Sequence, residues 1–181
     1  MRVVASEVKR ISALLGSGVF LVAAPGTVAG LVPWLLTHWK QEPPLLGLAV
    51  LRPLGALLLL PGLFVLLDSF LRFALQGLGT PAPVLPTRHL VVTGLYRYVR
   101  NPMYLAVLSI VVGQGLLFGS ERVLAYALIV FLAFHAFVVL YEEPTLRDSF
   151  GVEYEAFFKA VPRWLPRLEA WPGPPRGDPQ A

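Results

Sequence analysis

The sequence predicts an all-α integral membrane protein, a bundle of about four membrane-spanning helices, with five as the alternative. Of its 181 residues, 56% are hydrophobic and only 14% are charged, and the mean hydropathy is +0.66. A soluble protein of this size carries more charge on its surface. The apolar residues also lie in runs of about 20, the length that crosses the hydrocarbon core of a bilayer.

The first two expected spans lie in the N-terminal half of the chain. The span expected over 14–36 is uncharged, but two prolines, Pro33 among them, interrupt it, so we expect a kink whose freed carbonyl groups are bonded by neighbouring helices. The second span is expected over 45–67, with Arg52 near its start reaching toward the headgroups. Glycines and prolines then predict a loop over 70–92.

The third and fourth expected spans form a hairpin. They cover 103–119 and 123–141, and a connection of only three residues makes two helices antiparallel neighbours. The mixed apolar and charged segment that follows, up to residue 160, predicts a helix lying on the membrane surface. The chain is thus expected to be one membrane domain over 1–168, followed by a Pro- and Gly-rich disordered tail over 169–181.

Charge and cysteine content exclude several classes of protein. The net charge is +4, but the basic residues flank the spans and form no run or helix face that would indicate nucleic-acid binding. They gather before the first span, between the second and third, and after the fourth, which predicts that both termini are cytoplasmic. The chain has no cysteine, so it has no disulfide, Cys-based metal site or thiol nucleophile, and no other metal-ligand cluster is visible.

Two polar segments carry the chemistry that the sequence offers. The segment 94–104 enters the third span, and Glu142 and Glu143 leave the fourth. Because a hairpin returns the chain to the face that it left, we expect Arg100 and its neighbours Asn101 and Tyr104 to lie against these carboxylates. Two carboxylates at the C-terminal end of a helix oppose its dipole, so they need cations or donors nearby.

Structural roles are the alternative for these residues. Asn101 and Pro102 are also what any helix start contains, and the arginines and tyrosines are also what anchors a helix at a membrane interface. A plain ion pair with Arg100 would equally satisfy a carboxylate. His135, two turns before Glu142, is a candidate functional residue inside the span, although a bond to a neighbouring helix explains it as well.

The glycines of the third span indicate close packing. The spacing of Gly113, Gly115 and Gly119 favours a close approach between helices. Gln114, between the first two, is an uncommon residue inside a membrane span and is a candidate for lining a pocket.

The residues from His89 to Tyr104, then Glu142-Glu143, then 150–154 and 161–163 together resemble the isoprenylcysteine carboxyl methyltransferase family and its prokaryotic members, and more distantly the phospholipid N-methyltransferases. The resemblance covers about 86–167. It implies a membrane enzyme, in a prokaryotic cytoplasmic membrane, that uses S-adenosylmethionine at the cytosolic face to methylate a lipidic acceptor. It further implies cofactor-binding roles for His89, Gly94, Tyr96, Arg100, Asn101, Pro102, Tyr104, Glu142 and Glu143, with Arg100 and Glu142 acting in catalysis.

Several points stay open at the level of sequence. Asn101 stands where many family members have His, and Phe157 stands where a second Tyr is common. A carboxylate acceptor needs no general base, whereas an amine or thiol acceptor needs one, for which His89 and Glu142 are the candidates. An NADPH-dependent reductase of the steroid 5-alpha-reductase type, or a non-catalytic membrane module, are the alternative functions. The sequence does not determine the acceptor or the oligomeric state.

Overall fold

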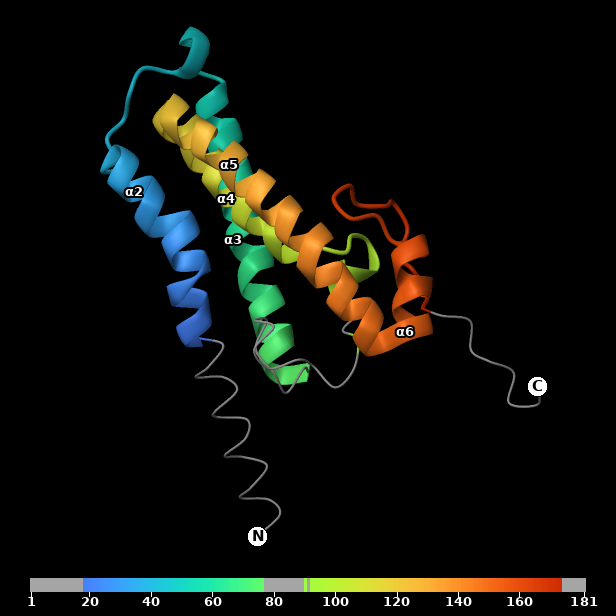
Figure 1. The fold of residues 1–181 in the computed structure, drawn as a ribbon. Helices are drawn as coiled ribbons and strands as arrows, with labels where there is room; N and C mark the ends of the chain where they lie inside the picture. The colour runs from blue at the N-terminus through green and yellow to red at the C-terminus, as the bar shows by residue number, and fades with distance from the viewer. Residues whose placement is uncertain (1–17, 77–89, 91, 174–181) are drawn as a thin grey trace, which may run out of the picture.

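The structure is a computed structural model that describes residues 18–76, 90 and 92–173, and all the regular structure in these ranges is helical (Figure 1). Three of the described helices are long and apolar enough to cross a membrane: Gly18–Thr37, Leu51–Arg72 and Glu121–Ala160. The helix Pro102–Phe118 is apolar but shorter, with 17 residues. The predicted all-helical class is therefore confirmed for the described residues, which include three helices of membrane-spanning length, while the number of passes stays a prediction.

The first helical segment contains the expected irregularity. Its π-helix η1, Thr27–Leu31, leads directly into α2, Val32–Thr37, and the N–H of Val32 bonds to the carbonyl of Thr27, five residues earlier. Pro33 has no N–H, so a carbonyl four or five residues before it loses its donor. The side chains of two other helices replace that donor: Gln114 Nε2 lies 2.6 Å from the Ala29 carbonyl oxygen, and Tyr126 Oη lies 3.0 Å from that of Val28.

This arrangement confirms that neighbouring helices satisfy the carbonyls freed by proline. It also explains Gln114, which the sequence proposed as a pocket residue. The Gln114 side chain is buried, and its Oε1 accepts a hydrogen bond of 3.3 Å from Trp39 Nε1. Gln114 therefore ties the first segment to the bundle.

The second spanning helix is displaced relative to the prediction. It is α3, Leu51–Gln76, whereas a span over 45–67 was expected. Leu45–Gly47 form a separate 3-10 turn, and Arg52 Nη2 donates to the carbonyl of Glu42 at 2.7 Å in the preceding loop. The predicted loop from residue 70 is wrong up to Gln76, because α3 includes these residues. The rest of that loop, 77–89 and 91, lies outside the described residues.

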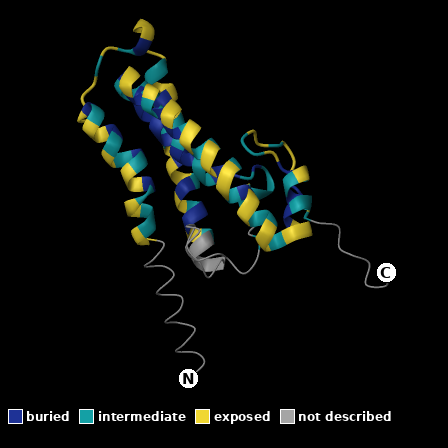
Figure 2. Cartoon of the chain, viewed as in Figure 1, coloured by how far each residue is buried: buried dark blue, intermediate teal, exposed yellow. Residues whose placement is uncertain are grey.

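The third and fourth spans form the predicted hairpin, with a turn one to two residues earlier than expected, since its second helix already includes Glu121 and Arg122. Helix α4, Pro102–Phe118, and helix α5, Glu121–Phe137, are joined at Gly119, whose φ of 76° ends α4 in the left-handed conformation. Helix α4 packs against both α3 and α5, and buried residues concentrate along it (Figure 2). It is the central helix of the bundle.

Glycine lets α3 and α4 approach closely, as the sequence predicted for the glycines of the third span. A Cβ atom at Gly113 would lie 2.7 Å from the carbonyl oxygen of Gly55, and one at Gly55 would lie 2.6 Å from that of Gly113. Neither position has room for a side chain.

The sequence predicts that the last spanning helix ends before a separate surface helix. In the structure, the two are continuous. Helix α5 continues through a π-helix η4, Val138–Glu142, into α6, Glu143–Ala160. The wider π turn accommodates Pro144, which has no N–H to continue a regular α-helix. Gly151, with φ of 50° and ψ of −122°, then bends α6.

The segment after α6 folds back onto the protein. Trp171 is buried in a cluster with Tyr154, Phe157 and Val161, and its backbone N–H donates to the Arg97 carbonyl at 2.9 Å. The predicted disorder from residue 169 onward is therefore wrong as far as Trp171. The prediction rests on the Pro- and Gly-rich composition of the tail, and it does not take account of the Trp171 ring, which packs into the cluster. Phe157, noted as a departure from the family pattern, is part of this same cluster.

Candidate functional site

The two polar segments singled out in the sequence meet at one end of the bundle. The short helix η3, Gly94–Arg97, and the residues that follow it lead into α4, while η4 and the first turn of α6 carry the carboxylates (Figure 1). Gly94 has a φ of 57°, in the left-handed region that favours glycine, and it begins this turn. The prediction that the hairpin brings these segments together is confirmed.

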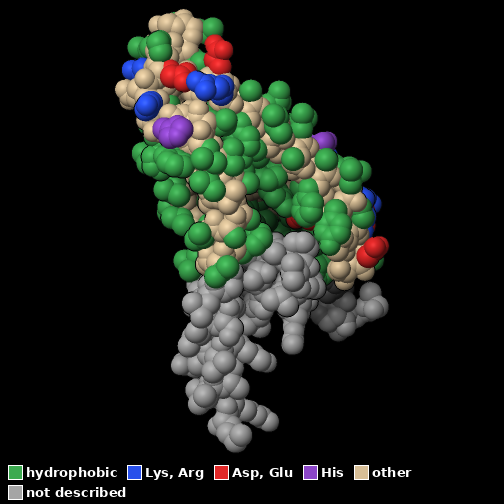
Figure 3. All heavy atoms as spheres, turned by 60° about the vertical axis from the view of Figure 1, so that its left-hand side comes forward, with side chains coloured by type: hydrophobic (Ala, Val, Ile, Leu, Met, Phe, Trp, Pro, Cys, Tyr) green, Lys and Arg blue, Asp and Glu red, His purple; other side chains and the backbone are tan. Residues whose placement is uncertain are grey.

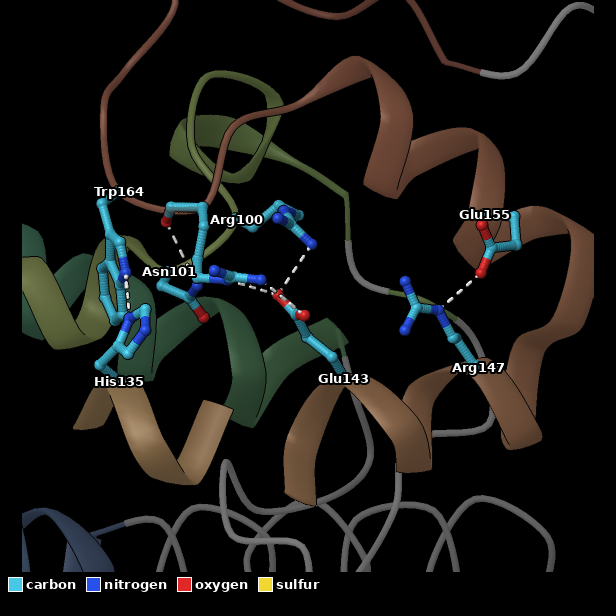
Figure 4. A network of polar contacts seen from close by, with 8 residues as sticks. Arg100, Asn101, His135, Glu143, Arg147, Glu155 and Trp164 are labelled. Carbon is cyan, nitrogen blue, oxygen red and sulfur yellow. Dashed lines mark hydrogen bonds and ion pairs between the residues drawn. The ribbon is translucent and has the colours of Figure 1, made fainter. Parts of the chain in front are cut away.

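Glu143 is buried and bonded to two arginines (Figure 4). Its Oε1 lies 3.0 Å from Arg100 Nη1 and 2.7 Å from Arg163 Nε, and its Oε2 lies 2.9 Å from Arg163 Nη2. The side chains of Glu143 and Arg100 are only 6% and 8% exposed. Hydrogen bonding to Glu143 raises the pKa of Arg163. Glu143 is thus neutralised within the protein, which matches the ion-pair alternative from the sequence.

Glu142 has a different partner. Its Oε2 accepts a hydrogen bond of 2.9 Å from Tyr104 Oη, and the ring of Tyr104 packs on Phe134 with centroids 4.7 Å apart. Burial, together with the nearby charge of Glu142, raises the pKa of Tyr96 well above its ordinary value. Glu142 therefore lies among neutral phenols, and the arginines bonded to Glu143 are not bonded to it.

Arg100 joins the two segments. Besides its bond to Glu143, its guanidinium carbon lies 4.1 Å from the centroid of the Phe158 ring, and its backbone N–H donates to the Pro162 carbonyl at 2.9 Å. Its Nε is buried and has no hydrogen-bond partner in the described part of the chain. Such a donor costs free energy unless it is satisfied.

Asn101 and Pro102 lie at the start of α4, as the structural alternative supposed. Pro102 is the first residue of the helix, but the Asn101 side chain does not cap it. Asn101 Nδ2 donates instead to the carbonyl of Arg163 at 3.2 Å. The Asn101 side chain therefore binds the segment after α6. His89, which was also expected in this site, lies outside the described residues.

Residues 162–164 also belong to this site, although they are not among the site residues expected from the sequence. Arg163 binds Glu143, and Trp164 Nε1 donates to His135 Nδ1 at 3.1 Å. His135 therefore makes a structural bond, but the expectation of a partner on a neighbouring helix is wrong, because the partner comes from the segment after α6. The sequence does contain an indication of this segment, because residues 161–163 are part of the family resemblance.

A small cavity lies at the centre of the cluster. Its volume is about 20 Å³, close to the space of one water molecule. It is lined by Arg100, Asn101, Val138, Glu142, Glu143, Leu146, Tyr154 and Phe157. A site for a molecule of nucleoside size needs about 300 Å³ or more. This cavity is therefore too small to hold such a molecule.

Comparison with known proteins identifies the family. The sequence profile of the phospholipid methyltransferase family matches residues 50–153, more than half of the chain. The match begins at α3, which the resemblance noted in the sequence did not include, and it contains both the start of α4 and Glu142-Glu143. No curated protein and no solved structure matches the chain. On the strength of the profile match, the chain belongs to the phospholipid methyltransferase family.

Proposed function

We propose that the protein is a membrane methyltransferase that uses S-adenosylmethionine and transfers a methyl group to a lipidic or lipid-linked acceptor at the cytosolic membrane face. The acceptor group is a carboxylate, an amine or a thiol, and the motifs shared with isoprenylcysteine carboxyl methyltransferases favour that branch of enzymes. The observation that carries the proposal is the division of the carboxylate pair: Glu143 is neutralised by two arginines, whereas Glu142 is bonded by a phenol.

The chemistry of the cluster fits S-adenosylmethionine, which supplies an activated methyl group when bound. A carboxylate set among neutral phenols attracts a cationic ammonium group and accepts hydrogen bonds from ribose hydroxyls, which is the role that we assign to Glu142. Arg100 has a buried Nε without a partner in the described ranges, and it is a donor for an anionic group. These residues form one wall of the proposed site.

The remaining residues position this wall. Tyr104 orients Glu142 through its hydroxyl group, and Tyr96 stays a neutral phenol because of its raised pKa. Gly94 permits the turn before α4, and Asn101 and Pro102 fix the start of that helix. Glu143 holds Arg100 in place. We further propose that His89, or Glu142 itself, takes a proton from an amine or thiol acceptor. A carboxylate acceptor carries no proton to remove and needs no such base.

Equilibrium binding of S-adenosylmethionine to the purified protein in detergent tests this proposal, with NADPH as a competitor. The variant Glu142→Gln keeps the size of the side chain and removes its charge. A charge-assisted hydrogen bond contributes about 1.5–3 kcal/mol, so we expect this variant to bind about 10- to 100-fold more weakly, with an unchanged melting temperature.

The matched control is Glu155→Gln, which removes a carboxylate that pairs with Arg147 on the same helix and lies outside the cluster. It should bind like the wild-type protein. Equal affinity of the wild-type protein and Glu142→Gln would show that Glu142 is not in the cofactor site. Selective binding of NADPH would favour the reductase alternative, and binding of neither ligand by folded protein would favour a non-catalytic module.

A further inference from the structure

The segment after α6 lies beside a membrane-spanning helix. Trp164 bonds to His135, and its ring centroid lies 5.6 Å from that of Phe131, both on α5 (Figure 4 shows Trp164 and His135). His135 and Phe131 precede Glu142 by seven and eleven residues, which is about 10 and 16 Å along a helix axis. Trp164 therefore contacts α5 two to three turns before the carboxylates, on a helix that is apolar enough to cross a bilayer.

A loop in water usually turns its apolar side chains toward the protein, whereas this segment turns its leucines outward. Leu165 and Leu168 are 79% and 98% exposed. The two arginines of the segment turn toward the protein instead: Arg163 binds Glu143, and Arg167 Nη1 donates to the Ala160 carbonyl at 3.1 Å, while Glu169 is exposed. Leu165 and Leu168 are thus apolar side chains that face outward beside two inward-facing arginines and ahead of an exposed carboxylate.

Two prolines and one hydrogen bond reduce the number of free backbone donors in the segment. Pro162 and Pro166 have no N–H, and the N–H of Arg167 donates to the Tyr98 carbonyl at 3.0 Å. Backbone groups without a partner make it costly for a loop to leave water, so these features lower the cost of contact with lipid.

Helix α5, which the segment contacts, also exposes apolar side chains. Leu128, Ile129 and Leu132 on α5 are all exposed. In Figure 1 the segment, drawn in red, lies beside the lower half of α5, and hydrophobic side chains also cover much of the face on the α2 side that Figure 3 brings forward. Exposed leucines thus occur both on the segment and on α5, a helix that is apolar enough to cross a bilayer.

We propose that residues 164–168 form an interfacial membrane anchor, with Leu165 and Leu168 inserted at the boundary between headgroups and acyl chains, and Trp164 fixing the segment to α5. Tryptophan is the residue enriched at this depth, and exposed apolar side chains drive such insertion. The partner is lipid and not a second protein. The proposal is independent of the methyltransferase reaction.

Single-cysteine labelling tests the anchor, because the chain has no cysteine of its own. Leu165→Cys and Leu168→Cys are labelled with a polarity-sensitive fluorophore and reconstituted in phosphatidylethanolamine/phosphatidylglycerol vesicles that contain lipids with a nitroxide near the headgroup. Asp148→Cys, at an exposed charged position of α6, is the matched control. Size-exclusion chromatography in detergent selects folded protein.

We expect blue-shifted emission at positions 165 and 168 and nitroxide quenching several-fold stronger than at position 148. Emission and quenching equal to the control at both positions would overturn the proposal, since the segment would then lie in water. Blue-shifted emission without nitroxide quenching would overturn it as well, because the leucines would then be covered by protein.

Discussion

At the scale of single residues, the two neighbouring carboxylates have separate tasks. Glu143 accepts three hydrogen bonds from two arginines, and Glu142 accepts one from Tyr104. The sequence predicted that cations or donors would meet this pair, because two carboxylates at a helix end cannot be left alone. It did not predict which partner each would take. Adjacent residues of a helix point about 100° apart, and the π turn ending at Glu142 changes that direction further.

The buried ion pair gives a prediction for stability. Glu143→Gln should lower the free energy of unfolding by about 3–5 kcal/mol, because it leaves the charge of the buried Arg100 without its partner. Arg147 and Glu155 form a pair whose side chains are 40% and 41% exposed, so Glu155→Gln should cost at most about 1 kcal/mol. Unfolding in mixed micelles with increasing SDS measures both variants. Equal losses in the two would contradict the structural role of Glu143.

At the scale of helices, glycines and prolines decide how the elements pack. Their positions were visible in the sequence, and so were the kink at Pro33 and the close approach at Gly113. The bounds of α3 were not predictable in the same way. Asp68 and Arg72 ended the apolar run there, but they pair across one helical turn at 2.6 Å and so continue the helix. The continuity of α5 with α6 was also missed, because Pro144 normally ends a helix.

The contact between α3 and α4 gives a second prediction. In Gly55→Ala the new methyl group would meet the backbone of α4, with the Gly113 carbonyl oxygen and the Leu117 nitrogen both 2.6 Å away. Backbone atoms cannot turn aside, so the two helices must separate, and we expect a melting temperature several degrees lower. Gly30→Ala is the matched control, because its methyl group would meet nothing within 4 Å. A Gly55→Ala protein as stable as the Gly30→Ala protein would contradict this packing.

At the scale of the whole molecule, the polar cluster and the loop between α2 and α3 lie at opposite ends of the bundle (Figure 1). Hydropathy and the distribution of arginines were sufficient to predict the class and to gather the site at one end. The segment after α6 was not predicted, because its packing depends on Trp164 and Trp171, two residues that contact parts of the chain far away in sequence. Local amino-acid composition does not indicate such long-range contacts.

The orientation in the membrane gives a third prediction. With both termini cytoplasmic, Gln41→Cys should react with a membrane-impermeant maleimide added to intact cells, whereas Asp148→Cys should react only after the cells are permeabilised. Both positions are exposed, so a failure to react reports the side of the membrane and not burial. Labelling of both positions from the same side would contradict the predicted topology.

The central claim is that this chain methylates a lipid through the site around Glu142. The most direct measurement follows a radiolabelled methyl group from S-adenosylmethionine into chloroform-extractable material, using purified protein in vesicles made from bacterial lipids and lipid-linked extracts. We predict label in the organic phase with the wild-type protein and about tenfold less or lower with Glu142→Gln, while Glu155→Gln equals the wild type. No label in the organic phase with folded wild-type protein, or equal label with Glu142→Gln, would contradict the account.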